Sequence, residues 1–228
     1  RQMTTVMSDN VHNIAIDGTF GDCQDMVKAM FNDAAFRKSS RLSAVNSINW
    51  ARIMAQIAYY VSAGVALGAP DRDIAFSVPT GNFGNVFAGY AARKMGLPIS
   101  ELIVGSNRND ILTRFFQSGE MAAAEVEPSL SPSMDIQVSS NFERLLFDVF
   151  DRDARRVTQS MAAFREGGSL SVDAEKLSDL RRLFSAGRLD DDETHARPRP
   201  LGEVGDMRLG GQEVAPEVGG VGRQEDAV

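Results

Sequence analysis

Between residues 74 and 105 the sequence alternates strand, turn, helix and strand, and this alternation restricts the fold more than any other feature. Four segments form the pattern: an apolar strand over residues 74–78, a turn over 79–85, a helix over 86–95 and an apolar strand over 102–105. Short, continuous apolar runs are typical of strands that are buried on both faces. Strands that alternate with helices at this spacing pair in parallel through right-handed crossovers. The sequence therefore predicts an α/β fold with a parallel sheet.

Further elements are expected on both sides of this unit. Residues 13–17 are short, apolar and followed by Gly18, which predicts a buried strand. The clearest helix starts near Trp50 and ends before Pro70, with Asn46 or Ser47 as its N-cap. Helical patterns also begin at Thr19 and Asp110 and cover residues 142–150, 154–164 and 174–184, whereas residues 32–43 are polar and residues 120–137 irregular.

The composition excludes several classes of function. The chain has 228 residues, 43% of them hydrophobic and 24% charged, as in one large or two small globular domains. Its net charge of -7 argues against a general nucleic-acid binder, because such proteins need a basic face. Cys23 is the single cysteine, which excludes an intrachain disulfide and a CxxC zinc site and favours a cytoplasmic location. Two histidines leave little material for a metal site.

Neither a membrane span nor a signal peptide is expected. The longest uncharged stretch covers residues 53–70, which is near the shortest length that crosses a bilayer. Gln56, Ser62 and Pro70 dilute it, so a buried soluble helix is favoured. The chain starts at Arg1, and no apolar signal-peptide region follows, which predicts a fragment of a longer protein.

The composition changes near the C-terminus. Residues 190–193 are four consecutive acids, for which a solvated face is favoured over a cation site. Residues 195–228 contain seven glycines and three prolines but no Phe, Tyr, Trp or Ile. Such a segment buries too little apolar surface to offset its ordering entropy, so a disordered tail is expected. A reading-frame change after Thr194 is the alternative. We therefore divide the chain into an α/β domain over residues 1–193 and a tail over residues 194–228.

The turn between the first strand and its helix carries the most informative motif. It reads Ser77-Val78-Pro79-Thr80-Gly81-Asn82-Phe83-Gly84-Asn85. Two glycines allow backbone angles that a side chain forbids, and consecutive N–H groups then point into one concavity. The following helix adds the positive end of its dipole, which suits a phosphate. A plain tight turn is the alternative. The motif is neither a Walker A loop nor a dinucleotide fingerprint.

Polar residues follow the second strand of the unit. Asn107, Asn109, Asp110 and Arg114 lie where parallel sheets bind ligands, and Arg114 suits a phosphate or carboxylate. Helix capping by Asn109 or Asp110, with Arg114 in a surface ion pair, explains the same residues equally well. Cys23 is expected to be a small packing residue, and each lysine is expected to lie on a solvated helix face or turn.

Several segments together resemble one enzyme family. The loop resembles the phosphate loop of threonine synthases, which are fold-type II enzymes that use pyridoxal 5'-phosphate (PLP). Other segments match in the same order along about residues 1–193: residues 14–20, 22–24, 46–49, 107–110 and 129–135. The resemblance does not cover residues 195–228. It implies an incomplete three-layer, Rossmann-like α/β fold with a parallel sheet.

The resemblance also implies a chemistry. Family members convert O-phospho-L-homoserine and water into L-threonine and phosphate, and PLP carries the reaction. By motif match, the residues that hold the PLP phosphate are Gly81, Asn82, Phe83, Gly84 and Asn85. Asn109, Asp110 and Arg114 are candidates for binding the substrate.

Two departures from the family pattern bear on activity. The family's Schiff-base lysine belongs to a segment that precedes Arg1, and a Thr-containing segment expected near Thr194 is replaced by the glycine-rich tail. The chain alone is therefore expected to be inactive. Two alternatives remain open, a non-catalytic α/β phosphate-binding module and a truncated gene product.

Overall fold

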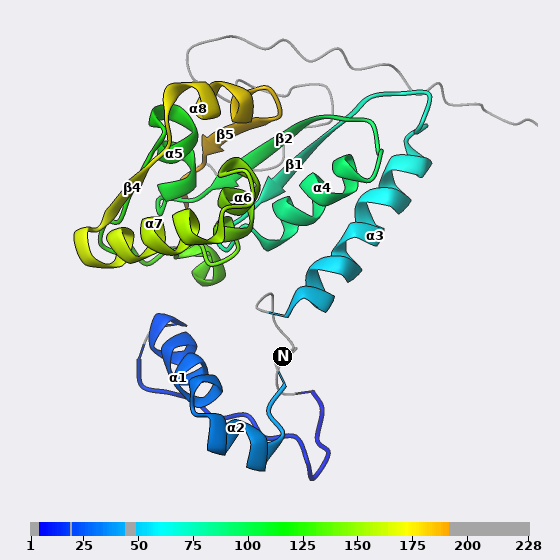
Figure 1. Ribbon diagram of the computed structural model, residues 1–228. Helices are drawn as coiled ribbons and strands as arrows, with labels where there is room; N and C mark the ends of the chain where they lie inside the picture. Colours follow the sequence, from blue (N-terminus) through cyan, green and yellow to red (C-terminus); the bar gives the residue numbers. More distant parts are fainter. Residues whose placement is uncertain (1–4, 19, 44–48, 192–228) are drawn as a thin grey trace, which may run out of the picture. The chain divides into compact units, whose positions relative to one another are not determined.

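A computed structural model describes residues 5–18, 20–43 and 49–191, which form two compact units (Figure 1). The first unit lies within residues 1–44 and the second within residues 45–228. The expected tail over residues 194–228 and the expected helix caps Asn46 and Ser47 lie outside the described residues.

The first unit consists of two short helices, α1 (Phe20–Asn32) and α2 (Ala34–Ser40). Asp33 caps α2 by accepting a hydrogen bond from the Phe36 N–H at 2.9 Å, which explains a helix in a segment that was expected to be polar. The strand expected over residues 13–17 is wrong: these residues form no strand, and Ile14 is 80% exposed. Apolar character alone makes no strand when the described residues offer no pairing partner.

The second unit contains a parallel sheet in the order β1-β2-β5, as the strand and helix pattern predicts. The strands are β1 (Ile74–Pro79), β2 (Ile99–Ser106) and β5 (Phe184–Arg188). Phe184 was expected to end a helix, but it begins β5 and pairs with Leu102 of β2. The non-local pairing with β2 therefore overrides the local helical pattern.

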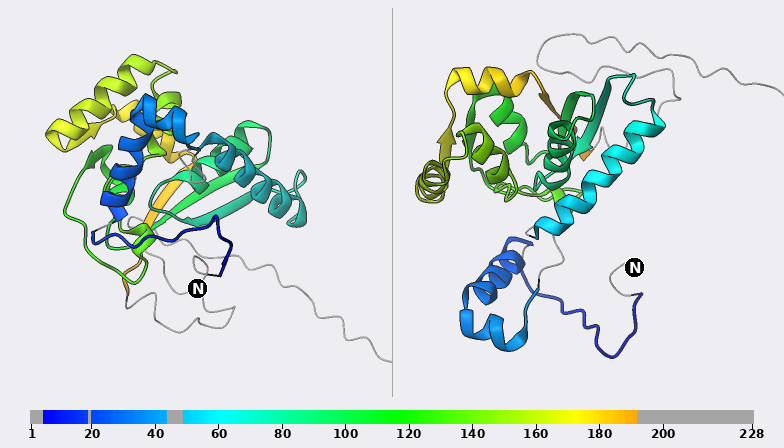
Figure 2. Two further views of the ribbon diagram at one scale, coloured as in Figure 1. Left: turned by 90° about the horizontal axis from the view of Figure 1, so that it is seen from below. Right: turned by 45° about the vertical axis from the view of Figure 1, so that its right-hand side comes forward.

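Helices cover one face of this sheet. They are α3 (Trp50–Ala66), α4 (Gly84–Lys94), α5 (Ile111–Ser118), α6 (Phe142–Val149), α7 (Ala154–Gly167) and α8 (Ala174–Arg181). Figures 1 and 2 show α3 alongside α4, which packs on β2. The N-cap of α3 is Asn49, whose side chain accepts from the Ala51 N–H at 3.0 Å. Three smaller elements complete the unit: β3 (Glu120–Ala122), antiparallel to β4 (Ser169–Ser171), and a 3-10 turn (Pro132–Met134).

The core lies on one face of the sheet. The ring of Phe184 in β5 stacks on the ring of Phe116 in α5, with centroids 5.3 Å apart. The ring of Tyr90 in α4 also stacks on Phe184, with centroids 6.0 Å apart. Residues of β1 that point to the other face, such as Ser77 and Pro79, are exposed. The described residues thus supply the sheet and the helical layer that covers one of its faces.

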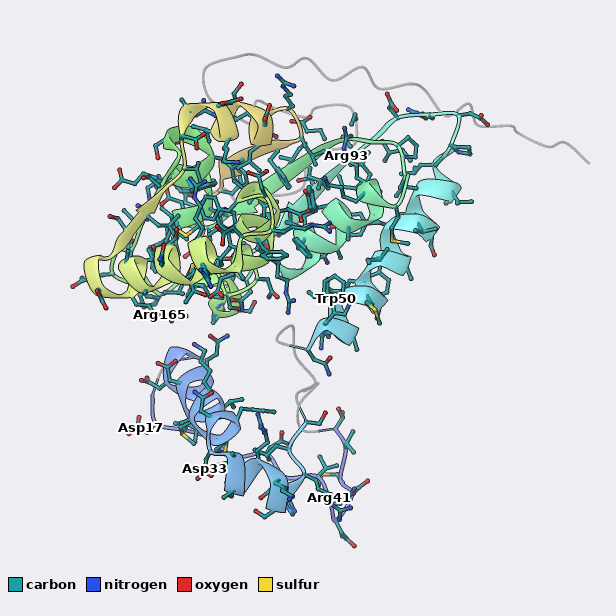
Figure 3. The ribbon with its side chains drawn as sticks, in the orientation of Figure 1. Asp17, Asp33, Arg41, Trp50, Arg93 and Arg165 are labelled. Atoms are coloured by element: carbon teal, nitrogen blue, oxygen red, sulfur yellow. The ribbon has the colours of Figure 1, made fainter. Side chains whose placement is uncertain are left out.

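Side-chain contacts link α6 to α3 and α4 to β2. Figure 3 labels three of the residues: Trp50 at the start of α3, Arg93 near the end of α4, and Arg165 of α7. The Arg144 guanidinium lies 5.4 Å from the centre of the Trp50 ring, and Arg93 donates to the Ile99 carbonyl. No helix within the described ranges is long and apolar enough to cross a membrane.

Candidate phosphate-binding site

The site begins where β1 ends. The Thr80 N–H donates to the Gly105 carbonyl at 2.9 Å, which extends the β1–β2 pairing by one bond. The Thr80 hydroxyl then accepts from the Phe83 N–H at 3.1 Å and closes the turn. The first residue of α4, Gly84, follows directly. Strand, turn and helix therefore have the arrangement expected from the sequence.

The residue with a left-handed backbone is Phe83, not a glycine. Its φ is 62°, whereas Gly81 has no left-handed φ and Gly84 belongs to the helix. An L-residue pays about 1–2 kcal/mol for this conformation. The Phe83 ring is fully buried and lies 5.2 Å from the Phe142 ring, so burial offsets the strain. The expectation that the glycines supply the unusual backbone angles is thus wrong.

Phe83 is also the N-cap of α4, and it contributes no side-chain hydrogen bond to the helix. A Ser, Thr, Asp or Asn at this position would satisfy one of the first N–H groups. Here these donors lack such a cap, and they coincide with the positive end of the helix dipole. The start of α4 therefore favours an anion.

The two asparagines of the loop are fixed by contacts to other elements. Asn85 Oδ1 accepts from the hydroxyl of Tyr60 of α3 at 2.6 Å, and the Asn85 carbonyl accepts from the same hydroxyl at 3.0 Å. Asn82 Oδ1 accepts from the Ser140 hydroxyl at 3.2 Å, and the Asn82 carbonyl accepts from the Asn141 N–H at 3.1 Å. Both amide oxygens are thus engaged as acceptors, which leaves the amide nitrogens as donors.

Gly81 is needed for close packing. A Cβ at this position would lie 3.1 Å from both Met134 Cα and Ile136 Cδ1, and 3.3 Å from the Ser133 carbonyl oxygen. Residues 133–136 therefore lie directly against the loop. An open pocket of about 360 Å³ lies on another side, lined by residues that include Tyr59, Tyr60, Pro79 and Asn85.

The three candidate substrate residues belong to one polar cluster. Arg114 Nε lies 2.9 Å from Asp110 Oδ1, so the expected ion pair is present. Asp110 is the N-cap residue of α5 but makes no side-chain cap hydrogen bond, and it also pairs with Arg188 at 3.3 Å. Asn109 is buried and does not cap the helix; its amide donates to the Glu127 carbonyl at 2.8 Å. Their binding of substrate stays a prediction.

The other candidates have partners of their own. Lys28 pairs with Asp25 and Lys176 with Asp151, each at 3.1 Å, and Lys94 Nζ lies 5.3 Å from the centre of the Tyr90 ring. These contacts agree with structural roles. Cys23 is a half-buried free thiol, and no group of metal-binding side chains occurs within the described ranges.

The acidic run is not simply a solvated face. Asp191 pairs with Arg108 at 3.0 Å and accepts from the Leu130 N–H at 3.3 Å. The carboxylate therefore ties the segment after β5 to Arg108, before α5, and to the irregular segment at Leu130. Residues 192–193 lie outside the described part.

Sequence reasoning missed three residues at the site. Tyr60 lies within the helix expected from Trp50 onward, and its contact with Asn85 spans 25 residues. Asp135 appeared only within a matched segment. Ser139 is 3% exposed, and its hydroxyl has no hydrogen-bond partner among the described residues. Local sequence carries no signal for such long-range contacts.

Comparisons with known proteins agree on one relationship. No family profile matches the chain. The threonine synthase of Pseudomonas aeruginosa is 59% identical over 194 residues, which cover 85% of this chain and 41% of that protein. The threonine synthase of Corynebacterium glutamicum is 51% identical over 203 residues, with 86% and 41% covered. The chain thus spans about two fifths of the length of these curated relatives.

Solved structures share the fold. A crystal structure of PLP-bound threonine synthase from Brucella melitensis is 53% identical with a TM-score of 0.77, over 85% of this chain and 42% of that one. Yeast threonine synthase is 40% identical with a TM-score of 0.72, over 85% and 40% of the two chains. The expected α/β fold of PLP enzymes of type II is therefore confirmed. Sequence and fold together place this chain with the threonine synthases, as a partial sequence of that family.

Proposed function

We propose that residues 80–85 and the start of α4 bind the phosphate of PLP. The observation that carries this proposal is the N-terminus of α4, where Phe83 provides no side-chain cap for the first N–H groups. A dianionic phosphate supplies acceptors for these donors and gains from the helix dipole. The buried Ser139 hydroxyl, which has no hydrogen-bond partner within the described part of the chain, adds a further polar group in the segment that contacts Asn82. The residues present therefore fit the group.

The proposed activity is that of a threonine synthase, which turns O-phospho-L-homoserine and water into L-threonine and phosphate. When bound, PLP supplies an electron sink for carbanions formed on the substrate. The chain's own contribution is binding and orientation. Backbone N–H groups at the start of α4 hold the phosphate, and Tyr60 fixes Asn85 beside it. The open pocket next to Asn85 offers space for the rest of the ligand.

Catalysis also needs a lysine that holds the cofactor, and we propose that this chain does not supply it. Lys28, Lys94 and Lys176 make the structural contacts described above. We accordingly propose that residues 1–193 form part of a cytoplasmic PLP enzyme and are inactive alone, with residues 194–228 as an appended tail. Asn109, Asp110 and Arg114 are proposed to bind the substrate, with Arg114 as the cation for its phosphate or carboxylate.

Equilibrium dialysis with two related ligands tests the phosphate site. PLP and pyridoxal differ only in the phosphate, so their difference in affinity isolates the contribution of the loop. We expect the 228-residue chain to bind PLP at least tenfold more tightly than pyridoxal, which corresponds to about 1.4 kcal/mol. Inorganic phosphate should compete with PLP. Equal affinities for the two ligands would refute the proposal.

A further inference from the structure

A polar cluster at the carboxyl end of β2 converges on one carboxylate. Asp135 accepts four hydrogen bonds from three residues. They come from Asn107 Nδ2 at 2.7 Å, Asn109 Nδ2 at 3.1 Å, the Ser129 hydroxyl at 2.6 Å and the Ser129 N–H at 2.9 Å. Both carboxylate oxygens are engaged. Because a carboxylate only accepts, it matches a site that is surrounded by donors.

The donors around Asp135 are themselves held in place. Asn107 Oδ1 accepts from the Asn109 N–H at 2.9 Å, and Asn109 Oδ1 accepts from the Glu127 N–H at 2.9 Å. Both asparagines are buried directly after β2. With their oxygens engaged as acceptors, each presents its Nδ2 to the carboxylate. The cluster therefore anchors the irregular segment around Asp135 to the rigid sheet.

The segment that contains Asp135, residues 133–141, packs against the proposed phosphate loop, and we call it the wall segment. Residues immediately before and after Asp135 lie against Gly81, at the distances of 3.1–3.3 Å that a Cβ there would meet. Farther along, Ser140 and the Asn141 N–H hold Asn82. The wall segment thus contacts the loop at Gly81 and Asn82, and Asp135 connects this segment to the end of β2.

We infer that Asp135 is a positioning residue for the phosphate loop. It touches no ligand; its carboxylate sets the place of residues 133–136, and these residues support Gly81 and the turn that ends at Phe83. This inference rests on the proposed function only in taking the PLP phosphate as the group that the loop binds. The positioning itself concerns contacts within the chain.

Asp135→Asn tests the inference with almost no change of size. The new Nδ2 would face donors from the surrounding residues, so at least one hydrogen bond is lost and the segment shifts. In the 228-residue chain we expect PLP affinity to fall at least fivefold while pyridoxal affinity stays unchanged. Amide exchange at Phe83, whose N–H is bonded to Thr80, should accelerate at least tenfold.

Asp148→Asn is the matched control. Asp148 is another carboxylate of this unit, and it accepts hydrogen bonds from the Tyr90 hydroxyl at 3.0 Å and from Arg152 at 3.2 Å. The substitution removes the same charge as Asp135→Asn. It should leave both ligand affinities and Phe83 exchange as in wild type. Ser129→Ala is a milder variant that removes one hydrogen bond from Asp135, and it should shift both measurements in the same direction. It carries the test if Asp135→Asn does not fold.

The outcomes separate this inference from the proposed function. A wild-type chain that does not prefer PLP over pyridoxal refutes the proposed function, and Phe83 exchange in the variants then decides the inference alone. The inference is overturned if Phe83 exchanges at the wild-type rate in folded Asp135→Asn. If Asp135→Asn does not fold, the same result in Ser129→Ala overturns the inference. Equal losses of PLP and pyridoxal affinity would overturn it as well, because they would indicate general loosening.

Discussion

The hydroxyl of Tyr60 in α3 lies 2.6 Å from Oδ1 of Asn85, the second residue of α4. The same hydroxyl also lies 3.0 Å from the Asn85 carbonyl oxygen. Tyr60 is 4% exposed, whereas its partner Asn85 is an exposed residue. The pair fixes an otherwise exposed amide at the start of α4 and couples α3 to the proposed phosphate loop.

Tyr60→Phe should weaken both the fold and the site. The ring still fills its place, but one hydrogen bond is lost, at a cost of about 1 kcal/mol. The Asn85 amide is then free to rotate, and we expect PLP affinity to fall about threefold, equivalent to about 0.7 kcal/mol. Urea unfolding and equilibrium dialysis measure the two effects. Tyr59→Phe is the control for stability, since Tyr59 is 64% exposed; an equal loss of stability from both variants would contradict the assignment.

Gly89→Ala should destabilise the second unit through the same tyrosine. A Cβ at Gly89 would lie 2.7 Å from Tyr60 Cε1 and 3.0 Å from Leu102 Cδ2, so α3 or the ring must move. Overpacking of this kind costs about 1–3 kcal/mol. Chemical denaturation checks the value.

Gly167→Ala provides the opposite control for that experiment. Gly167 is the last residue of α7, and nothing lies within 4 Å of an added Cβ. Alanine there should be neutral or stabilising by up to about 1 kcal/mol, because it favours helix. If both glycine variants had the same stability, the close approach of Gly89 to Tyr60 would be wrong.

The sequence predicts the β1–α4–β2 unit because each of its elements has a strong local pattern. The strand at residues 74–78 and the helix at residue 50 onward appear with small shifts at their ends. Elements that depend on distant partners were not predicted. Phe184–Arg188 becomes a strand by pairing with β2, and residues 13–17 lack a partner in the described part and form no strand. Pairing, not local composition, decides such segments.

For the site, too, the features with a local sequence pattern were predicted, and the features that depend on distant contacts were not. The position of the loop follows from a strand, two glycines and a helix in succession. The left-handed residue was not predicted, because the strain at Phe83 is offset by contacts with Phe142 and other rings distant in sequence. The role of Gly81 also depends on a distant segment, residues 133–136. Those contacts become visible only in the folded chain.

Two tyrosines predict a loss of stability at alkaline pH. Burial raises the pKa of Tyr60, and burial together with the hydrogen bond to Asp148 raises the pKa of Tyr90. In the unfolded chain both titrate near pH 10. Their contribution is therefore complete below about pH 10 and is lost above it, by up to about 1.4 kcal/mol per pH unit for the buried Tyr60 and by less for the half-buried Tyr90, which solvent screens.

Urea unfolding between pH 9 and 11.5 measures this slope. Tyr60→Phe and Tyr90→Phe should each reduce it, and the double variant should reduce it by about the sum, because the two hydroxyls have different partners. A double variant with the wild-type slope would exclude these tyrosines as its source.

Gly84→Asp should remove the proposed phosphate site while keeping the helix. Gly84 is the first residue of α4, where an acidic side chain is favourable to the helix dipole. The same carboxylate would occupy the N–H donors and repel a dianionic phosphate. We expect PLP affinity to fall at least tenfold, or about 1.4 kcal/mol, in equilibrium dialysis. Pyridoxal affinity should change little.

Two further substitutions separate charge from bulk at this position. Gly84→Asn has nearly the same size as Gly84→Asp without the charge, so it should lose less PLP affinity. Asn82→Ala removes one amide donor but leaves the backbone N–H groups, so its effect should be smaller still. Circular dichroism confirms that each variant is folded. If folded Gly84→Asp retained wild-type PLP affinity, the phosphate would have to bind elsewhere, and residues 80–85 would be a structural turn between β1 and α4.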